Sequence, residues 1–212
     1  MNFSAACVII IYGEVIIRGK SEYDYIKNII RRNYFMCGIV GYIGQRDCTD
    51  VLMQGLEKLE YRGYDSAGIA VFEKTGIKTV KTKGKLADMR HKLDIEGSPV
   101  GHCGIGHTRW ATHGEPSDIN SHPHTNGRVT IVHNGIIENY IELKEFLTEK
   151  GYTFTSQTDT EVVACLLDYY YSERNPLRAI TETLKELKGS YALGIIFRDF
   201  PDRVYATRKE SP

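Results

Sequence analysis

The sequence lacks the long apolar run that a membrane span requires. Its most apolar stretch, residues 5–17, is interrupted by Glu14 and is shorter than the roughly 20 residues that cross a bilayer as a helix. The chain also lacks the basic start and small-residue cleavage site of a signal peptide. We therefore expect no membrane partner and no export.

Cysteine pairs, metal-ligand spacings and phosphate-binding loops are also missing. The five cysteines are widely spaced without a C-x-x-C pair, which favours a reducing, cytoplasmic setting over a disulfide framework or zinc module. Six of the seven histidines lie between His102 and His133, but without H-E-x-x-H or another usual ligand spacing. We expect these histidines to be structural or to line a substrate pocket. Without a G-x-x-x-x-G-K-[ST] or G-x-G-x-x-G loop, we expect neither a metal nor an organic cofactor.

An excess of charge of one sign is absent as well. The 27 Lys+Arg residues balance the 27 Asp+Glu residues, so no general attraction to nucleic acid is expected. With 42% hydrophobic and 25% charged residues, the composition is ordinary for a globular protein. A chain of 212 residues suffices for one good-sized domain or for a domain with an appendage.

The hydrophobic periodicity indicates strands in clusters and helices in clusters, which predicts an α+β fold of packed sheets with helices outside them. The expected strands are residues 8–12, 15–17, 37–44, 68–72, 78–82, 104–111, 129–133, 191–197 and 203–207, and the expected helices are 49–60, 138–150, 159–172 and 176–188. Met36 precedes the strand that opens this pattern. We expect the strands and helices after Met36 not to use the preceding extension.

Cys37 is the candidate nucleophile. A lone cysteine is usually a small buried hydrophobe, but Cys37 directly follows Met36, and removal of an initiator methionine would leave Cys37 with a free α-amine. The pKa of an α-amine, about 7.7–8.0, lies near working pH. One residue would then supply both the thiol and the base that deprotonates it.

Three further positions suit a polar substrate, each with a plainer alternative. Arg109, beside the sole tryptophan Trp110, forms either a surface ion pair or a two-pronged clamp for a carboxylate. Asn134-Gly135 indicates either a turn or an oxyanion hole made by the Asn134 amide and the Gly135 N–H. Asp159 is either a first-turn acid of a helix with a capping box or the partner of a substrate ammonium group.

Taken together, several strings resemble the class II glutamine amidotransferases, and within that class they are similar to the isomerising glucosamine-6-phosphate synthases. The strings are residues 37–41, 59–68, 106–114, 122–124, 132–139 and 158–162. The related phosphoribosyl amidotransferases usually read His-Arg-Gly-Gln-Glu-Ser where this chain has Tyr61-Arg-Gly-Tyr-Asp-Ser66. The resemblance implies the four-layer αββα sandwich of the N-terminal nucleophile hydrolases.

The resemblance also implies a role for each matching residue. Cys37 attacks the side-chain amide of L-glutamine, forming a thioester and releasing ammonia, with its own α-amine as base. Asn134 and Gly135 form the oxyanion hole, Arg109 holds the α-carboxylate and Asp159 holds the α-ammonium group. Of the remaining residues, Thr112 and His113 line the pocket, Trp110 belongs to the gate over the ammonia route, and Arg62 supports the loop of the nucleophile.

The resemblance covers residues 37–212, which we interpret as a C-terminally incomplete glutamine amidotransferase type 2 domain preceded by an extension, residues 1–36, that is foreign to the family or cleavable. It implies that ammonia aminates fructose-6-phosphate in a sugar-phosphate isomerase domain missing from this chain, and that full-length members form homodimers. Two alternatives stay open. The chain is a catalytically silent glutamine-binding fragment because Cys37 lacks a free amine, or it is another class II amidotransferase.

Overall fold

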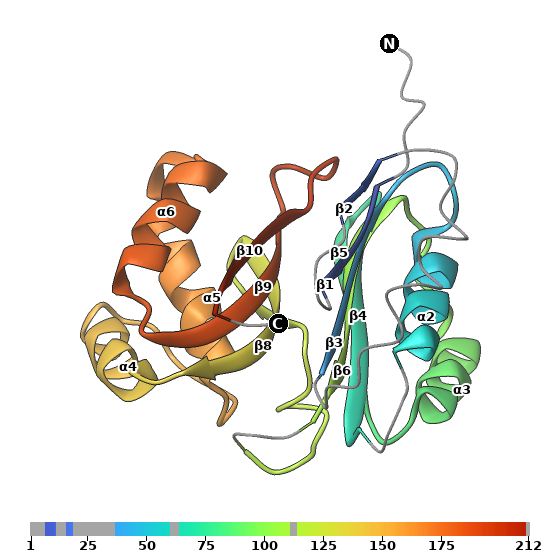
Figure 1. Ribbon diagram of the computed structural model, residues 1–212, viewed down its shortest axis with the longest axis horizontal. Coiled ribbons are helices and arrows are strands. Elements are labelled where there is room, and N and C mark those ends of the chain that lie inside the picture. Colours follow the sequence, from blue (N-terminus) through green and yellow to red (C-terminus); the bar gives the residue numbers. More distant parts are fainter. Residues whose placement is uncertain (1–6, 12–15, 19–36, 60–63, 111–113, 211–212) are drawn as a thin grey trace.

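The protein is built on two antiparallel β-sheets that stack face to face (Figure 1). The computed structural model describes residues 7–11, 16–18, 37–59, 64–110 and 114–210. The six-stranded sheet has the order β2 (Ile16–Arg18), β1 (Cys7–Ile11), β3 (Gly38–Ile43), β6 (Cys103–Arg109), β4 (Ser66–Glu73), β5 (Gly76–Lys83). The four-stranded sheet has the order β10 (Tyr205–Lys209), β9 (Gly189–Phe197), β8 (Val129–Ile137), β7 (His124–Asn126).

Helices cover both outer faces of this pair of sheets (Figure 1). The six-stranded sheet carries α2 (Cys48–Lys58) and α3 (Leu86–Glu96). The four-stranded sheet carries α4 (Tyr140–Glu149), α5 (Asp159–Tyr170) and α6 (Pro176–Glu186), with the short 3-10 helix η1 (Tyr171–Glu173) between the last two. The predicted α+β fold, a four-layer αββα sandwich, is confirmed. None of the helices in the described segments is both long and apolar enough to cross a bilayer.

Three apolar clusters fill the spaces between these four layers. Two lie between a sheet and its own helices. The third, the inter-sheet cluster, consists of Ile39, Ala70, Phe72, Cys103, Ile105, Val132, Ala192 and Ile196. Successive side chains of a strand point to opposite faces, so each inner strand supplies residues of one parity to the inter-sheet cluster and residues of the other parity to the helices.

The sequence located most of these elements, but it missed α3 and β7. Helix α3 buries only Leu86, Met89 and Leu93, and its N-cap is Lys85, whose side chain makes no capping hydrogen bond. A helix that buries three of its eleven residues and has no Ser, Thr, Asp or Asn cap gives little periodic or capping signal. β7 has only three residues, which is too short for an alternation to be recognised.

The structure corrects the expectation that the extension stays apart from the later strands. β1 pairs antiparallel with β3, in a register that runs from Cys7 opposite Ile43 to Ile11 opposite Ile39. Without β1, β3 would be the edge of its sheet and would present unpaired N–H and C=O groups. A short apolar segment nearby in the chain satisfies these groups, and this is the physical reason why the expectation was wrong.

Candidate active site

Three candidate residues converge between the two sheets: Cys37 directly before β3, Asn134 in β8 and Arg109 in β6. Cys37 directly precedes β3 and has the same parity as Ile39, a member of the inter-sheet cluster. Asn134 follows Val132 by two residues in β8, and Arg109 follows Ile105 by four in β6. Because side chains two or four residues apart share a face of a strand, all three side chains point into the space between the sheets.

Glycines in β6 make room for a helix on its other face. A Cβ at Gly104 would lie 2.9 Å from Sγ of Cys48, and one at Gly106 would lie 3.2 Å from Cδ1 of Leu56. Both partners belong to α2. The alternation of glycine with larger residues therefore lets α2 pack closely while His107 and Arg109 face inward.

The thiol of Cys37 sits against the backbone of Trp110. The Trp110 N–H donates to Cys37 Sγ at 3.0 Å, and the thiol in turn lies 3.6 Å from the Trp110 carbonyl oxygen. Burial raises the pKa of the Cys37 thiol above its usual value, and the Trp110 N–H only partly offsets this. The thiol is therefore protonated at neutral pH and needs a base before it can act as a nucleophile.

Asn134 reaches the backbone of Cys37 from the opposite sheet. Its Nδ2 donates to the Cys37 carbonyl oxygen at 2.5 Å, and its Oδ1 lies 2.7 Å from Nε2 of His107. The next residue, Gly135, has φ 114°, and a Cβ there would lie 2.1 Å from the Ser190 carbonyl oxygen. Asn134-Gly135 lies inside β8, so the alternative that this pair forms a hairpin turn is wrong.

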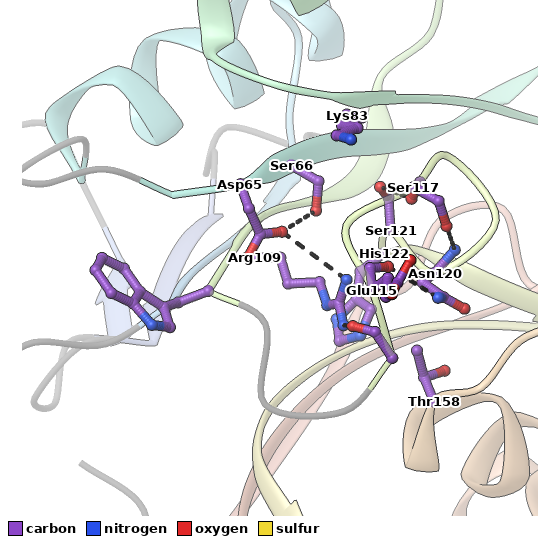
Figure 2. Close-up of polar contacts among 12 residues, drawn as sticks. Asp65, Ser66, Lys83, Arg109, Glu115, Ser117, Asn120, Ser121, His122 and Thr158 are labelled. Atoms are coloured by element: carbon purple, nitrogen blue, oxygen red, sulfur yellow. Dashed lines mark hydrogen bonds and ion pairs between the residues drawn. The ribbon is translucent and has the colours of Figure 1, made fainter.

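Arg109 is a buried cation, which excludes the alternative of a surface ion pair. Its side chain is 4% exposed, and Nη1 lies 3.8 Å from Oδ1 of Asp65. Nη2 donates to the Gly114 carbonyl oxygen at 3.0 Å. The Ser66 hydroxyl donates to the same Asp65 oxygen at 2.9 Å (Figure 2). The next residue, Trp110, is by contrast 53% exposed.

Asp159 begins α5 and joins that helix to the end of β8. It is buried, and its Oδ2 accepts from the N–H of Ile137 at 2.9 Å, two residues beyond Gly135. The predicted capping box is only half formed. Thr158 accepts from the N–H of Glu161 at 3.3 Å, but the Glu161 carboxylate binds the preceding loop, accepting from the N–H and hydroxyl groups of Thr155 and Ser156.

Four histidines near these residues are buried, namely His107, His122, His124 and His133. The rings of His107 and His122 have centroids 4.3 Å apart, and those of His122 and His133 are stacked at 6.4 Å. Burial lowers the pKa of His107 and of His124 to about 3, so both are neutral at physiological pH. Within the described segments, no group of three or more His, Cys, Asp or Glu side chains is arranged to hold a metal ion.

Some of the predicted positions lie outside the described residues, and some contacts were not predicted. Thr112, His113 and Arg62 fall in the former group. The contacts that sequence reasoning missed are the Asp65 carboxylate beside Arg109 and the ring of His107 beside Asn134. Both residues lie in strings that carry the family resemblance, residues 59–68 and 106–114, but the resemblance implies no specific role for either residue.

Comparison with protein families and curated proteins gives a consistent result. Residues 107–210 match a family described as a glutamine amidotransferase domain. The chain is similar to glutamine--fructose-6-phosphate aminotransferases [isomerizing] from several bacteria. It is 57% identical over 179 residues to that of Clostridium tetani and 52% identical over 182 residues to that of Thermus thermophilus. Each alignment covers 84% of this chain and 29% of the relative, so the chain spans under a third of the length of these relatives.

Solved structures show the same fold. Glutamine phosphoribosylpyrophosphate amidotransferase from B. subtilis superposes with a TM-score of 0.64 and 27% sequence identity, over 77% of this chain and 35% of that chain. A structure described as the allosteric regulatory enzyme of purine biosynthesis superposes with a TM-score of 0.65 and 28% identity over the same shares. The four-layer sandwich is thus the fold of known amidotransferases.

Proposed function

Because the chain belongs to the glutamine amidotransferase family, we propose that it hydrolyses L-glutamine to glutamate and ammonia through a thioester on Cys37. The observation that carries this proposal is the meeting of two groups from different sheets. The Asn134 amide nitrogen lies 2.5 Å from the Cys37 carbonyl oxygen, beside the thiol that would attack. A nucleophile with an adjacent amide donor is the arrangement that acyl transfer requires.

The reaction proceeds in two steps when Cys37 is the first residue. Its α-amine takes the thiol proton, sulfur attacks the side-chain carbonyl carbon of glutamine, and the oxyanion forms beside the Asn134 amide and the Gly135 N–H. The protonated amine passes its proton to the departing nitrogen, and ammonia leaves as the C–N bond breaks. Water, deprotonated by the same amine, then cleaves the thioester to glutamate and the free thiol.

The substrate is anchored through its α-carbon groups. Arg109 binds the α-carboxylate and Asp159 binds the α-ammonium group, supported by their burial and by their positions on β6 and at the start of α5. Thr112 and His113 line the pocket, Trp110 gates the ammonia route and Arg62 supports the nucleophile's loop. These last roles rest on the family resemblance.

The use of the ammonia is part of the same proposal. Since the relatives are named fructose-6-phosphate aminotransferases, the ammonia aminates fructose-6-phosphate, in amino-sugar synthesis, on a sugar-phosphate isomerase domain outside residues 1–212. A homodimer of the full-length protein and a cytoplasmic location belong to this proposal. The location is supported by Cys48, Cys103 and Cys165, which are free and buried.

A second candidate function is a silent glutamine-binding domain. The pairing of β1 with β3 favours it, because this pairing anchors the extension beside the strand that Cys37 opens. If Met36 remains attached, the nitrogen of Cys37 is an amide and cannot act as the base.

The experiment that tests the proposal measures glutamate release and the N-terminal residue of the same purified sample. We expect glutaminase activity in samples whose first residue is Cys37, and loss of nearly all of it in Cys37→Ala and Cys37→Ser. If Cys37→Ala retained ordinary turnover, the nucleophile would have to be another residue. Protein that is found only with Met36 retained, and that binds glutamine without hydrolysing it, would support the second candidate.

A further inference from the structure

His107 makes a short contact to the side-chain amide of Asn134. His107 lies in β6 of the six-stranded sheet and Asn134 lies in β8 of the four-stranded sheet. Their side chains meet across the inter-sheet space, with His107 Nε2 2.7 Å from Asn134 Oδ1. Both residues are buried, so water does not compete freely for this contact.

The hydrogen-bonding groups around Asn134 determine which way its amide faces. The carbonyl oxygen of Cys37 can only accept a hydrogen bond, so the group 2.5 Å from it must be the amide nitrogen. The amide oxygen then faces His107, and an oxygen can only accept. His107 must therefore carry its proton on Nε2 and donate it to Asn134.

The surroundings of His107 hold that tautomer and that ring position. Burial lowers the pKa of His107 to about 3, which keeps the ring neutral, with one N–H donor, across physiological pH. Its ring packs against that of His122, with centroids 4.3 Å apart. His122 is itself fixed, because Nδ1 accepts from the His133 N–H at 3.4 Å and Nε2 lies 3.0 Å from the Thr160 hydroxyl.

We infer that His107 is a positioning residue, whose Nε2–H holds the Asn134 amide so that its nitrogen faces Cys37. The inference deepens the proposed function, on which its catalytic meaning rests. Rotating the amide by 180° would exchange its oxygen and nitrogen. An oxygen facing the developing oxyanion would repel it, whereas the nitrogen donates to it. His107 therefore acts on the reaction through Asn134, without touching the substrate.

The kinetic consequence is a change in kcat rather than KM. Loss of one oxyanion-hole donor typically lowers kcat by about 10²–10³-fold. We expect His107→Phe to approach this loss with little change in KM for glutamine, because the contact with Asn134 does not hold the substrate's α-carbon groups. His107→Gln retains an N–H donor at about the position of Nε2 and should recover most of the activity.

The deciding experiment is nitrogen NMR on the full chain, which needs no turnover. In the wild type we expect His107 to remain neutral from about pH 5 to 9, because its pKa is low, and to carry its proton on Nε2 rather than Nδ1, because Nε2 faces the Asn134 oxygen. The side-chain amide signals of Asn134, identified by their loss in Asn134→Asp, should be shifted and protected from exchange. His107→Phe should abolish that protection, His107→Gln should restore it, and the control His124→Phe should leave it intact.

His124 is a matched control because it is equally buried but contacts the Thr158 hydroxyl, 3.1 Å away, instead of Asn134. A proton on Nδ1 of His107 in the wild type would overturn the inference, and this result needs no variant to fold. Unchanged Asn134 signals in His107→Phe would overturn it as well. If the NMR result holds and no chain hydrolyses glutamine, the proposed function fails while the positioning contact stands.

Discussion

At the scale of single residues, the chemistry depends on how each side chain is buried. Asn134 illustrates what a sequence leaves open, because Asn-Gly is most often a turn and only the pairing of β8 with β9 places it mid-strand. The burial of Arg109 is likewise a result of tertiary structure that the sequence does not show. The sequence motifs identified the candidate residues themselves. They did not predict that Asp65 lies beside Arg109 or that His107 lies beside Asn134, because tertiary packing brings these pairs together.

The raised pKa of Cys37 predicts slow alkylation at neutral pH. Thiolate is the reactive form, and burial raises the pKa of this thiol above its usual value of about 8.5. In chain that retains Met36, the iodoacetamide rate at Cys37 should therefore keep rising beyond pH 9, as followed by peptide mass spectrometry. The buried thiols of Cys48, Cys103 and Cys165 serve as internal unreactive controls. A rate that levels off below pH 8 would contradict the burial argument.

Arg109→Lys should raise the KM for glutamine strongly and change kcat less. An ammonium group cannot reproduce the two-pronged contact with a carboxylate, and this contact exists in both the ground and transition states. Steady-state kinetics on chain that begins at Cys37 would measure both constants. Arg128→Lys is the control, because Arg128 is held by Asp168 at 3.2 Å and has no part in the proposed site. Equal KM values for the wild type and Arg109→Lys would place Arg109 outside the pocket.

At the scale of helices and strands, the sequence predicted which elements exist better than it predicted where each one begins and ends. The helix that begins at Pro176 was marked by Asn175, whose side chain accepts from the N–H of Arg178, and its start was predicted correctly. β8 runs to Ile137 rather than ending at residue 133, because pairing with β9 continues through Asn134-Gly135. Strand length is set by the partner strand, which a single sequence does not identify.

Two buried threonines on helices should respond in opposite ways to replacement by valine. Thr183 in α6 is fully buried, and its hydroxyl makes no hydrogen bond to the described residues. Removing an unsatisfied polar group is neutral or favourable, so Thr183→Val should preserve or increase the free energy of unfolding. Thr49 in α2 donates to the Pro99 carbonyl oxygen at 2.6 Å, and Thr49→Val should cost about 1–3 kcal/mol by leaving that oxygen unpaired.

Urea unfolding of the two valine variants and the wild type would measure these changes. Both replacements put a β-branched residue of nearly the same shape into a helix, so their effects on helix propensity cancel in the comparison. Equal destabilisation by both would mean that the hydroxyl of Thr183 has a partner outside the described residues.

At the scale of the whole molecule, the extension has two opposing effects. Its strand β1 continues the six-stranded sheet beyond β3, and its attachment at Met36 converts the α-amine of Cys37 into an amide. The sequence predicted the second effect from covalent chemistry. It did not predict the first, since which apolar segment covers a sheet edge is decided by register and proximity in the folded chain.

We expect full-length protein, verified by mass as unprocessed, to be nearly inactive as a glutaminase. General-base assistance is typically worth about 10²–10⁴-fold, and the amide cannot provide it. A chain that starts at Met36, and loses that methionine, should be active but less stable, because β3 loses its neighbour. Glutamate release and thermal unfolding would measure the two effects, each kcal/mol lowering the midpoint by about 2–4 °C for a chain of this size. Equal glutaminase rates for the unprocessed full-length protein and for the chain that starts at Met36 would contradict the N-terminal-amine mechanism.

The division of the site between two sheets makes the inter-sheet cluster a spacer. Cys37 precedes a strand of one sheet, Asn134 lies in the other, and small residues such as Ala70 and Ala192 fill part of the gap between them. Ala192 lies directly opposite Asn134 on the neighbouring strand β9. Added volume at that position would wedge the sheets apart and draw the amide away from the thiol. The turnover number would then fall as the distance between the two sheets increases.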